Sequence, residues 1–266
     1  MKKKIAILGG GNIGKSIANG LLASGEYNPE DLIITRRNIR FLDDMKEKGL
    51  TISANNAEAV AECALIILCV QPGQISDLIM EIRDHMDPDK HIVASIITAY
   101  EVKDLVKLFG KELPIVRVMP NTAIGIRESM TCLATGSKKN GVLEKVKEVF
   151  DLLGTTMVIT EPLMSSATIL GACGIAFFLR YIRAASQGGI QVGFHAEEAQ
   201  IIAAQTARGA ASLLLQTGNH PEDEIDKVTT PRGCTIAGLN EMEHFGLSSA
   251  VIKGIVTSFN EIEKLK

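Results

Sequence analysis

The chain has 266 residues, of which 46% are hydrophobic and 22% are charged, a composition typical of a globular protein. Its formal net charge of −3, its 4% aromatic content and its lack of tryptophan argue against nucleic acid or an anionic membrane as a partner. The five cysteines are scattered without metal-ligand spacing, so we expect no metal site and reduced thiols in a cytoplasmic protein.

Two apolar stretches have part of the pattern of membrane or targeting segments. Ile5–Leu8 follows a run of lysines, but it is too short for a signal peptide and glycines interrupt it at once. Ala167–Leu179 is shorter than the ~18 apolar residues that a membrane span needs, and Arg180 closes it. We therefore expect a soluble protein with no membrane partner.

Up to about residue 160, short apolar runs alternate with amphipathic stretches. The first, third, fourth and fifth of these runs are almost continuously apolar, as expected of parallel strands covered on both faces. The expected strands are Lys4–Gly9, Leu32–Thr35, Leu65–Val70, His91–Ile97, Ile115–Met119, Thr131–Thr135 and Thr156–Ile159. The expected helices are Ile13–Ser24, Ile75–Met86, Ala99–Phe109 and Gly141–Leu153. This alternation predicts an α/β fold with a Rossmann-type doubly wound sheet.

A glycine-rich turn, GGGNIG, joins the first expected strand to the first expected helix. Gly9 permits a tight turn, Gly11 lets backbone N–H groups approach a pyrophosphate, and Gly14 lets the helix pack on the strand. Asn12 and Ile13 complete this turn at the helix N-terminus, whose partial positive charge favours an anion. The turn predicts a dinucleotide site; the alternative is a glycine turn without a ligand.

The end of the second expected strand indicates which dinucleotide binds. NAD-binding folds usually place an acid there, whereas this chain has Arg36 and Arg37. Guanidinium groups suit a 2′-phosphate, so we expect NADP (NADPH), with NAD not excluded. The alternative is that the two arginines form a solvated face. Val70, Gln71 and Pro72 follow the next sheet run and would lie over the cofactor, or would form an ordinary turn.

Beyond Pro162 the pattern changes to long helical segments without a convincing strand. The expected helices are Leu163–Gln187, Ala196–Gln216, Thr235–His244 and Leu247–Leu265. We place a dinucleotide-binding domain at residues 1–160 and an all-helical domain at residues 161–266.

Five segments together resemble the pyrroline-5-carboxylate reductase family, and the resemblance covers essentially the whole chain. Gly9–Gly14 (GGGNIG) is similar to the family's GxGNMG, and Val70–Pro72 (VQP) to its VKP. Asn56–Val60 is similar to an Asn-x-Glu segment, and Arg117–Thr122 (RVMPNT) matches RxMPNT. The most specific segment is Val228–Leu239 (VTTPRGCTIAGL), which is similar to the signature VTSPGGxTIAGL.

The resemblance implies reduction of 1-pyrroline-5-carboxylate to L-proline, the last step of proline biosynthesis, by an NAD(P)H-dependent oxidoreductase acting on a C–N bond. It implies a helical dimerisation domain, so that a homodimer or a higher homo-oligomer is expected, with the active site at the junction with the cofactor domain. It also adds Asn56 to the cofactor residues.

The signature has a chemical sense of its own. It precedes a helix, and backbone N–H groups at a helix N-terminus can bind a small carboxylate. We assign substrate binding to Thr230, Gly233, Cys234 and Thr235. The resemblance makes Thr235 the expected catalytic residue, and its hydroxyl can hydrogen-bond an imine nitrogen and pass on a proton. The alternative is that Thr235 only caps the helix.

Two departures from the family lie near the expected substrate site. Arg232 replaces a glycine of the signature, where it either pairs with a carboxylate or is a surface arginine. Residues 171–177 (GACGIAF) lack the hydroxyls and the proline of the family. Two alternatives therefore stay open: a reductase of another small cyclic imine or carbonyl acid, and a non-catalytic dinucleotide-binding paralogue.

Overall fold

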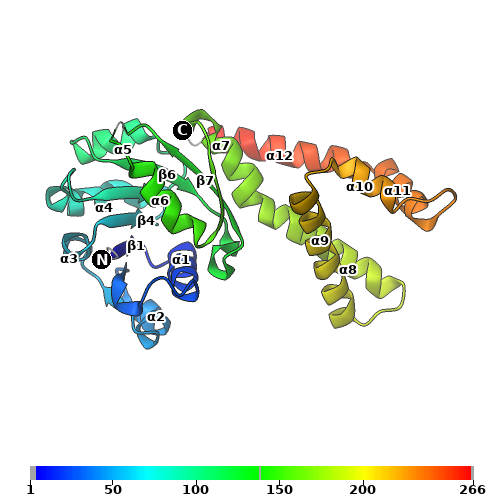
Figure 1. Ribbon diagram of the computed structural model, residues 1–266, viewed down its shortest axis with the longest axis horizontal. Helices are drawn as coiled ribbons and strands as arrows, with labels where there is room; N and C mark the ends of the chain where they lie inside the picture. Colours follow the sequence, from blue (N-terminus) through cyan, green and yellow to red (C-terminus); the bar gives the residue numbers. More distant parts are fainter. Residues whose placement is uncertain (1–3, 138, 265–266) are drawn as a thin grey trace. The chain divides into compact units, whose positions relative to one another are not determined.

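The computed structural model describes residues 4–137 and 139–264 (Figure 1). The chain packs as two compact units. The first runs to Cys173 and takes in the chain again from Phe259, and the second is Gly174–Ser258. The domain boundary between residues 160 and 161 stays a prediction.

The first unit is built on an eight-stranded sheet of order β3-β2-β1-β4-β5-β6-β7-β8. Neighbouring strands are parallel except β6 and β7, which are antiparallel. The strands are β1 Ile5–Leu8, β2 Leu32–Thr35, β3 Thr51–Ser53, β4 Leu65–Leu68, β5 Ile92–Ser95, β6 Ile115–Met119, β7 Ser129–Thr135 and β8 Gly154–Val158. The expected α/β fold is confirmed, and β3 is an edge strand that the sequence pattern does not reveal.

Helices cover both faces of this sheet (Figure 1). They are α1 Asn12–Ala23, α2 Asp43–Glu47, α3 Asn56–Glu62, α4 Ile75–Ile82, α5 Val102–Phe109, α6 Val142–Asp151 and α7 Met164–Ala167. Successive side chains of a strand point to opposite faces. In β1, Ile5 and Ile7 therefore join the core under α1 and α6, and Ala6 and Leu8 the core under α3, α4 and α5.

The strand order reverses beside β1, with β2 on one side and β4 on the other. Ligands of doubly wound sheets bind in the crevice at such a reversal, beyond the carboxyl ends of the strands. The loops that follow β1, β2 and β4 therefore surround the expected cofactor site.

One expected helix begins later than the sequence pattern suggests. We expected Ala99–Phe109, whereas α5 begins at Val102 after Glu101, whose side chain forms a capping box with Asp104. Ala99 has φ +70°, in the left-handed region, which interrupts a right-handed helix.

The second unit is helical. Its helices are α8 Gly174–Gln191, α9 Ala196–Thr217, α10 Pro221–Lys227, α11 Cys234–His244 and the start of α12 Leu247–Glu263. The final residue of the expected last helix, Leu265, lies outside the described residues. Of residues 174–258, only Gly174 and Ala199 are buried. This unit therefore has almost no hydrophobic core of its own.

A π-helical turn, Thr168–Cys173, lies between α7 and α8. The whole helical stretch Glu161–Gln191 is 31 residues long and has an 18-residue window of mean hydropathy 1.7, of which 28% is buried. By length and composition this helix, which is longer than the apolar stretch Ala167–Leu179 on which our expectation rested, could cross a membrane. A helix that packs in a protein core or interface has the same composition, so this single helix is weak support for a membrane segment.

Candidate functional site

A cavity of about 440 Å³ lies beyond the ends of β1, β2 and β4. Three loops and the inward face of α4 form its wall. The lining residues are Gly9, Gly10, Gly11, Thr35, Arg36, Arg37, Asn38, Phe41, Asn56, Cys69, Val70, Gln71, Gln74, Asp77, Leu78 and Glu81. Most of the expected cofactor residues are thus brought together from segments far apart in the sequence.

The glycines of the first loop fit a close approach between backbones and ligand. Gly9 has φ +116°, and a Cβ there would lie 2.6 Å from the carbonyl oxygen of Cys69. A Cβ on Gly14 would lie 2.2 Å from the carbonyl oxygen of Gly9, so only glycine lets α1 pack on this turn. At Gly11, by contrast, no heavy atom of the described residues lies within 4 Å of an added Cβ. The space beside Gly11 is open.

Helix α1 begins beside this open space. Gly11 is its capping residue, and Asn12, Ile13 and Gly14 of the first turn carry no charge. The N–H groups of a first helical turn have no partner inside the helix and attract anions. Asn12, Ile13 and Gly14 do not line the cavity themselves; they follow Gly11, which does. The loop thus fits the pyrophosphate of a dinucleotide.

Arg36 is held against the glycine loop. Its Nη1 donates to the carbonyl oxygen of Gly10 at 2.9 Å, and its guanidinium lies 4.3 Å from the centre of the Phe41 ring. Such a cation–π contact restrains the guanidinium while leaving other N–H groups to bind a ligand. Arg37 is exposed at the same cavity. The two cations are therefore placed to meet a phosphate group at this end.

The opposite wall carries carboxylates that the sequence analysis missed. Gln74, Asp77 and Glu81, with Leu78 beside Asp77, recur every three or four residues and so lie on one face of the α4 segment. Three polar positions and an apolar one at this spacing are the signal that could have identified them. Glu81 accepts hydrogen bonds from the backbone N and Nδ2 of Asn56, at 3.0 and 2.8 Å.

The loop after β4 contributes Cys69, Val70 and Gln71 to the cavity. Desolvation raises the pKa of the Cys69 thiol, so the thiol stays neutral beside a bound phosphate. Pro72 does not line this cavity; it lines a separate hollow with Gly73 and Ala99.

The segment Arg117–Thr122 is structural in its described contacts. Asn121 is buried; its Oδ1 accepts from the backbone N of Ala123 at 3.0 Å, and its Nδ2 donates to the carbonyl oxygen of Gly171 at 3.2 Å. The second bond reaches the π-helical turn, where backbone carbonyls lose their regular helical partners. This motif therefore fixes the turn rather than contacting the cavity.

The signature segment lies in the second unit, in the loop after α10 and the first part of α11. The N–H of Gly233 donates to the carbonyl oxygen of Thr230 at 2.9 Å, closing a turn with Pro231 and Arg232 in the middle. Arg232 has φ +59°. A turn with proline second and a positive φ third is normally of type II and prefers glycine in the third position. Arginine is thus held in a backbone conformation that favours glycine.

Helix α11 begins directly after this turn, with Gly233 as its capping residue and Cys234 and Thr235 as its first two residues. The alternative that Thr235 merely caps the helix is therefore wrong. Backbone N–H groups of Cys234 and Thr235 lie at the positive end of an 11-residue helix. That arrangement can bind a carboxylate.

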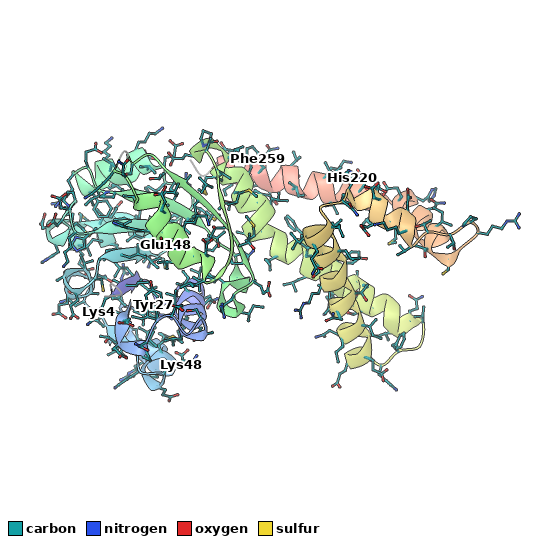
Figure 2. All side chains as sticks on the ribbon, in the orientation of Figure 1. Lys4, Tyr27, Lys48, Glu148, His220 and Phe259 are labelled. Atoms are coloured by element: carbon teal, nitrogen blue, oxygen red, sulfur yellow. The ribbon has the colours of Figure 1, made fainter. Side chains whose placement is uncertain are left out.

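The histidines have structural positions. His195 caps α9, and His220, labelled in Figure 2, caps α10 and accepts from the backbone N of Glu222 at 3.3 Å. His91 is buried, and its Nδ1 accepts from the backbone N of Asp87 at 2.8 Å. Within residues 4–137 and 139–264, no group of three or more histidine, cysteine, aspartate or glutamate residues is placed to hold a metal ion.

Two family models match the chain. Residues 161–265 match a model described as pyrroline-5-carboxylate reductase dimerisation. Residues 4–98 match a model described as NADP oxidoreductase, coenzyme F420-dependent. The two matches fall on the helical part and on the glycine-loop part of the chain.

Known proteins are similar over nearly the whole chain. Pyrroline-5-carboxylate reductase 2 of Dictyostelium discoideum is 46% identical, over 98% of this chain and 93% of that protein. Pyrroline-5-carboxylate reductase 1 of the same organism is 48% identical over 98% of this chain, which spans only 49% of that protein's length.

Solved structures agree in fold. The pyrroline-5-carboxylate reductase of Coxiella burnetii has a TM-score of 0.90 and is 26% identical, with 100% of this chain and 99% of that one covered. The Plasmodium falciparum pyrroline carboxylate reductase, solved with NADP bound, has a TM-score of 0.90 at 22% identity, with 99% and 98% covered. With 46% identity over 93% of a relative, the chain belongs to the pyrroline-5-carboxylate reductase family.

Proposed function

We propose that this protein reduces 1-pyrroline-5-carboxylate to L-proline with NADPH, the last step of proline biosynthesis. The observation that carries the proposal is the Thr230–Leu239 segment, which places Thr235 in the first turn of α11 in a member of this family. Both D. discoideum relatives are named pyrroline-5-carboxylate reductases, which supports the same substrate here.

In this proposal the cofactor residues are those expected from the sequence. Backbone groups of Gly9, Gly11, Asn12, Ile13 and Gly14 hold the pyrophosphate. Charged groups of Arg36 and Arg37 hold a 2′-phosphate, which favours NADPH over NADH. The remaining wall is formed by Asn56, Val70 and Gln71, whereas Pro72, which was also expected there, lines a separate hollow. When bound, NADPH supplies the hydride for the imine carbon.

The substrate residues lie at the start of α11. The N–H groups of Cys234 and Thr235 bind the substrate carboxylate, while the Thr230–Gly233 turn shapes the loop in front of them. The Thr235 hydroxyl donates a hydrogen bond to the ring nitrogen, which must gain a proton when the C–N double bond is reduced. Arg232 adds a positive charge beside this carboxylate site. Such positioning supplies most of the rate when the chemistry itself belongs to the cofactor.

The test is the oxidation of NADPH by the purified protein, followed by nicotinamide absorbance with and without 1-pyrroline-5-carboxylate. We expect turnover, and faster turnover with NADPH than with NADH. Thr235→Ala should lower kcat, and Thr235→Ser, which keeps a hydroxyl, should restore most of it. Binding of NADPH without turnover of this substrate would refute the proposal.

The cofactor preference has a separate test. Changing Arg36 and Arg37 together to Ala should reduce the ratio of kcat/KM for NADPH to that for NADH. About tenfold is expected for the loss of a charge-assisted phosphate contact. An unchanged ratio would show that the arginines do not read the 2′-phosphate.

A second candidate is a reductase of another small cyclic imine or carbonyl acid. The π-helical turn Thr168–Cys173 favours it, because this turn overlaps the segment that departs from the family and lacks its hydroxyls. A panel of cyclic imines and carbonyl acids in the same assay decides between them. Higher kcat/KM for another compound than for 1-pyrroline-5-carboxylate would favour the second candidate, and turnover of any of them rules out a non-catalytic paralogue.

We further propose a homodimer, or a higher homo-oligomer, formed through a helical dimerisation and substrate domain at residues 161–266. Large apolar side chains are exposed along α8 and α12, among them Phe178 at 69% and Ile252 at 61%. A second copy of this chain is the partner that the dimerisation model of residues 161–265 supports.

A cytoplasmic location is proposed from the cysteines, which are all free thiols: Cys63, Cys69, Cys132, Cys173 and Cys234. Thiols stay reduced in the cytosol, whereas secreted domains tend to form disulfides. Detection of the tagged protein in the soluble cytosolic fraction would support this location, and its recovery with membranes would contradict it.

A further inference from the structure

Both carboxylate oxygens of Glu81 accept hydrogen bonds from one residue, Asn56. Its Oε1 accepts from the backbone N of Asn56 at 3.0 Å, and its Oε2 accepts from Nδ2 of the same residue at 2.8 Å. A carboxylate accepts only, so it requires the amide NH2 of Asn56 to face it and the amide oxygen to point away. Glu81 therefore fixes which way the Asn56 side chain is turned.

The other end of the Asn56 amide completes a connected network. Its Oδ1 accepts from Oγ1 of Thr35 at 2.5 Å. Thr35 ends β2 and is buried, and its carbonyl oxygen accepts from the backbone N of Gly10 at 2.7 Å and of Gly9 at 3.3 Å. A continuous series of hydrogen bonds thus runs from α4, through the start of α3 and the end of β2, to the glycine loop.

Each of these residues also lines the cofactor cavity. We propose that Glu81 is a positioning residue for the dinucleotide, which acts through Asn56 and Thr35 to hold this wall and the glycine loop in the geometry that binds the cofactor. The proposal rests on the proposed function, because it concerns the same cofactor site. It also explains why a carboxylate stands in a cavity that takes phosphates: both its oxygens are occupied by N–H donors.

The experiment measures Kd for NADPH and NADH by nicotinamide fluorescence with the full-length protein. In Glu81→Gln, an amide NH2 replaces one acceptor and faces a donor of Asn56. We expect Kd for both dinucleotides to rise about tenfold, as for loss of a hydrogen bond to a charged group. At saturating NADPH, kcat should stay within about twofold of the wild-type value, because Glu81 positions the cofactor site and takes no part in the chemical step. Glu112→Gln, an exposed site outside the cavity, is the matched control and should leave Kd unchanged.

A double-mutant cycle tests whether Glu81 acts through Asn56. Residues in one network give non-additive effects, so Glu81→Gln combined with Asn56→Ala should bind no more weakly than Asn56→Ala alone. Thr35→Val breaks the same network from the other end and should raise both Kd values, which keeps the test open if Glu81→Gln does not fold. Additive effects of Glu81→Gln and Asn56→Ala, or an unchanged Kd in both Glu81→Gln and Thr35→Val, would overturn the proposal.

Simple charge repulsion predicts a different pattern. If Glu81 acted only as a negative charge near the 2′-phosphate, Glu81→Gln would bind NADPH more tightly and NADH unchanged, which would also overturn the proposal. Binding is measured without substrate, so it is independent of turnover. A wild-type protein that binds NADPH but does not reduce 1-pyrroline-5-carboxylate refutes the proposed function and leaves the role of Glu81 to stand or fall on the Kd values.

Discussion

Gly11 and Gly14 belong to the same loop, yet alanine should weaken NADPH binding at Gly11 and destabilise the fold at Gly14. Gly11 has φ −83° and ψ −165°, an extended conformation that alanine adopts readily, and no described heavy atom lies within 4 Å of the added Cβ. The free energy of unfolding of Gly11→Ala should therefore change by no more than about 0.5 kcal/mol. The methyl group would instead fill space that the pyrophosphate needs. We expect at least about a tenfold loss of NADPH affinity, or ~1.4 kcal/mol.

Gly14→Ala should damage the fold itself. Its Cβ would lie 2.2 Å from the carbonyl oxygen of Gly9 and 3.2 Å from Cγ2 of Ile7, whereas ordinary contact begins at 3.4 Å. Because a backbone atom is the closer neighbour, α1 must move away from β1, and overpacking of this kind costs about 1–3 kcal/mol. For a chain of this size each kcal/mol lowers the Tm by about 2–4 °C.

The assays are thermal unfolding by circular dichroism without ligand and NADPH binding by fluorescence. Gly73→Ala is the control for the substitution itself, because its Cβ meets no described heavy atom within 4 Å and Gly73 lies outside the cofactor cavity. Wild-type NADPH affinity in Gly11→Ala would refute the assignment of the open side of this loop to the pyrophosphate.

Three further predictions rest on single positions. Ala99→Gly should raise the Tm by about 1–2 °C, because relief of the left-handed strain at φ +70° exceeds the entropy cost of glycine by about 0.5 kcal/mol; a lower Tm in thermal unfolding would contradict this. Phe178→Glu should shift the protein toward monomer in sedimentation experiments, because burying a phenylalanine is worth about 1.5–3 kcal/mol and a charge there opposes association; an unchanged oligomer would place the interface elsewhere. Burial lowers the pKa of His91 below the 6.5 that is usual for histidine, so the unfolded chain takes up the proton first as the pH falls. The stability from neutral His91 is present above about pH 6.5 and is lost below it, by at most about 1.4 kcal/mol per pH unit; urea unfolding of His91→Asn should show a weaker pH dependence, and equal slopes would contradict this.

The sheet was predictable because the central strands are almost continuous apolar runs between helical patterns. Leu65–Leu68 is wholly apolar and Ile115–Met119 is interrupted only by Arg117, because burial on both faces leaves little freedom in composition. The strand Thr51–Ser53 was not predictable, because it has three residues at the sheet edge and its side chains stay partly exposed. A segment so short carries no periodicity.

The site was predictable where it depends on the backbone of one loop. The spacing of Gly9, Gly11 and Gly14 indicates their role. The backbone excludes a side chain at Gly9 and Gly14, and the space beside Gly11 is left open. Glu81 and Phe41 reach the cavity only through the packing of α4 and of the loop after β2, which a single sequence does not reveal. The left-handed backbone of Arg232 was likewise hidden, since the sequence identifies an unusual residue but not the dihedral angle that makes it unusual.

Because the second unit has almost no core of its own, its folding should depend on the protein concentration. With only Gly174 and Ala199 buried among residues 174–258, most of its apolar surface can leave water only when another molecule covers it. For such a protein, the folded population depends on how many chains share the solution, and mass action sets its stability as it would for a ligand. Dilution should therefore lower the apparent melting temperature of the helical part, while NADPH should protect the sheet-containing part. The stability of the sheet-containing part would thus depend on the dinucleotide concentration, and that of the helical part on the protein concentration.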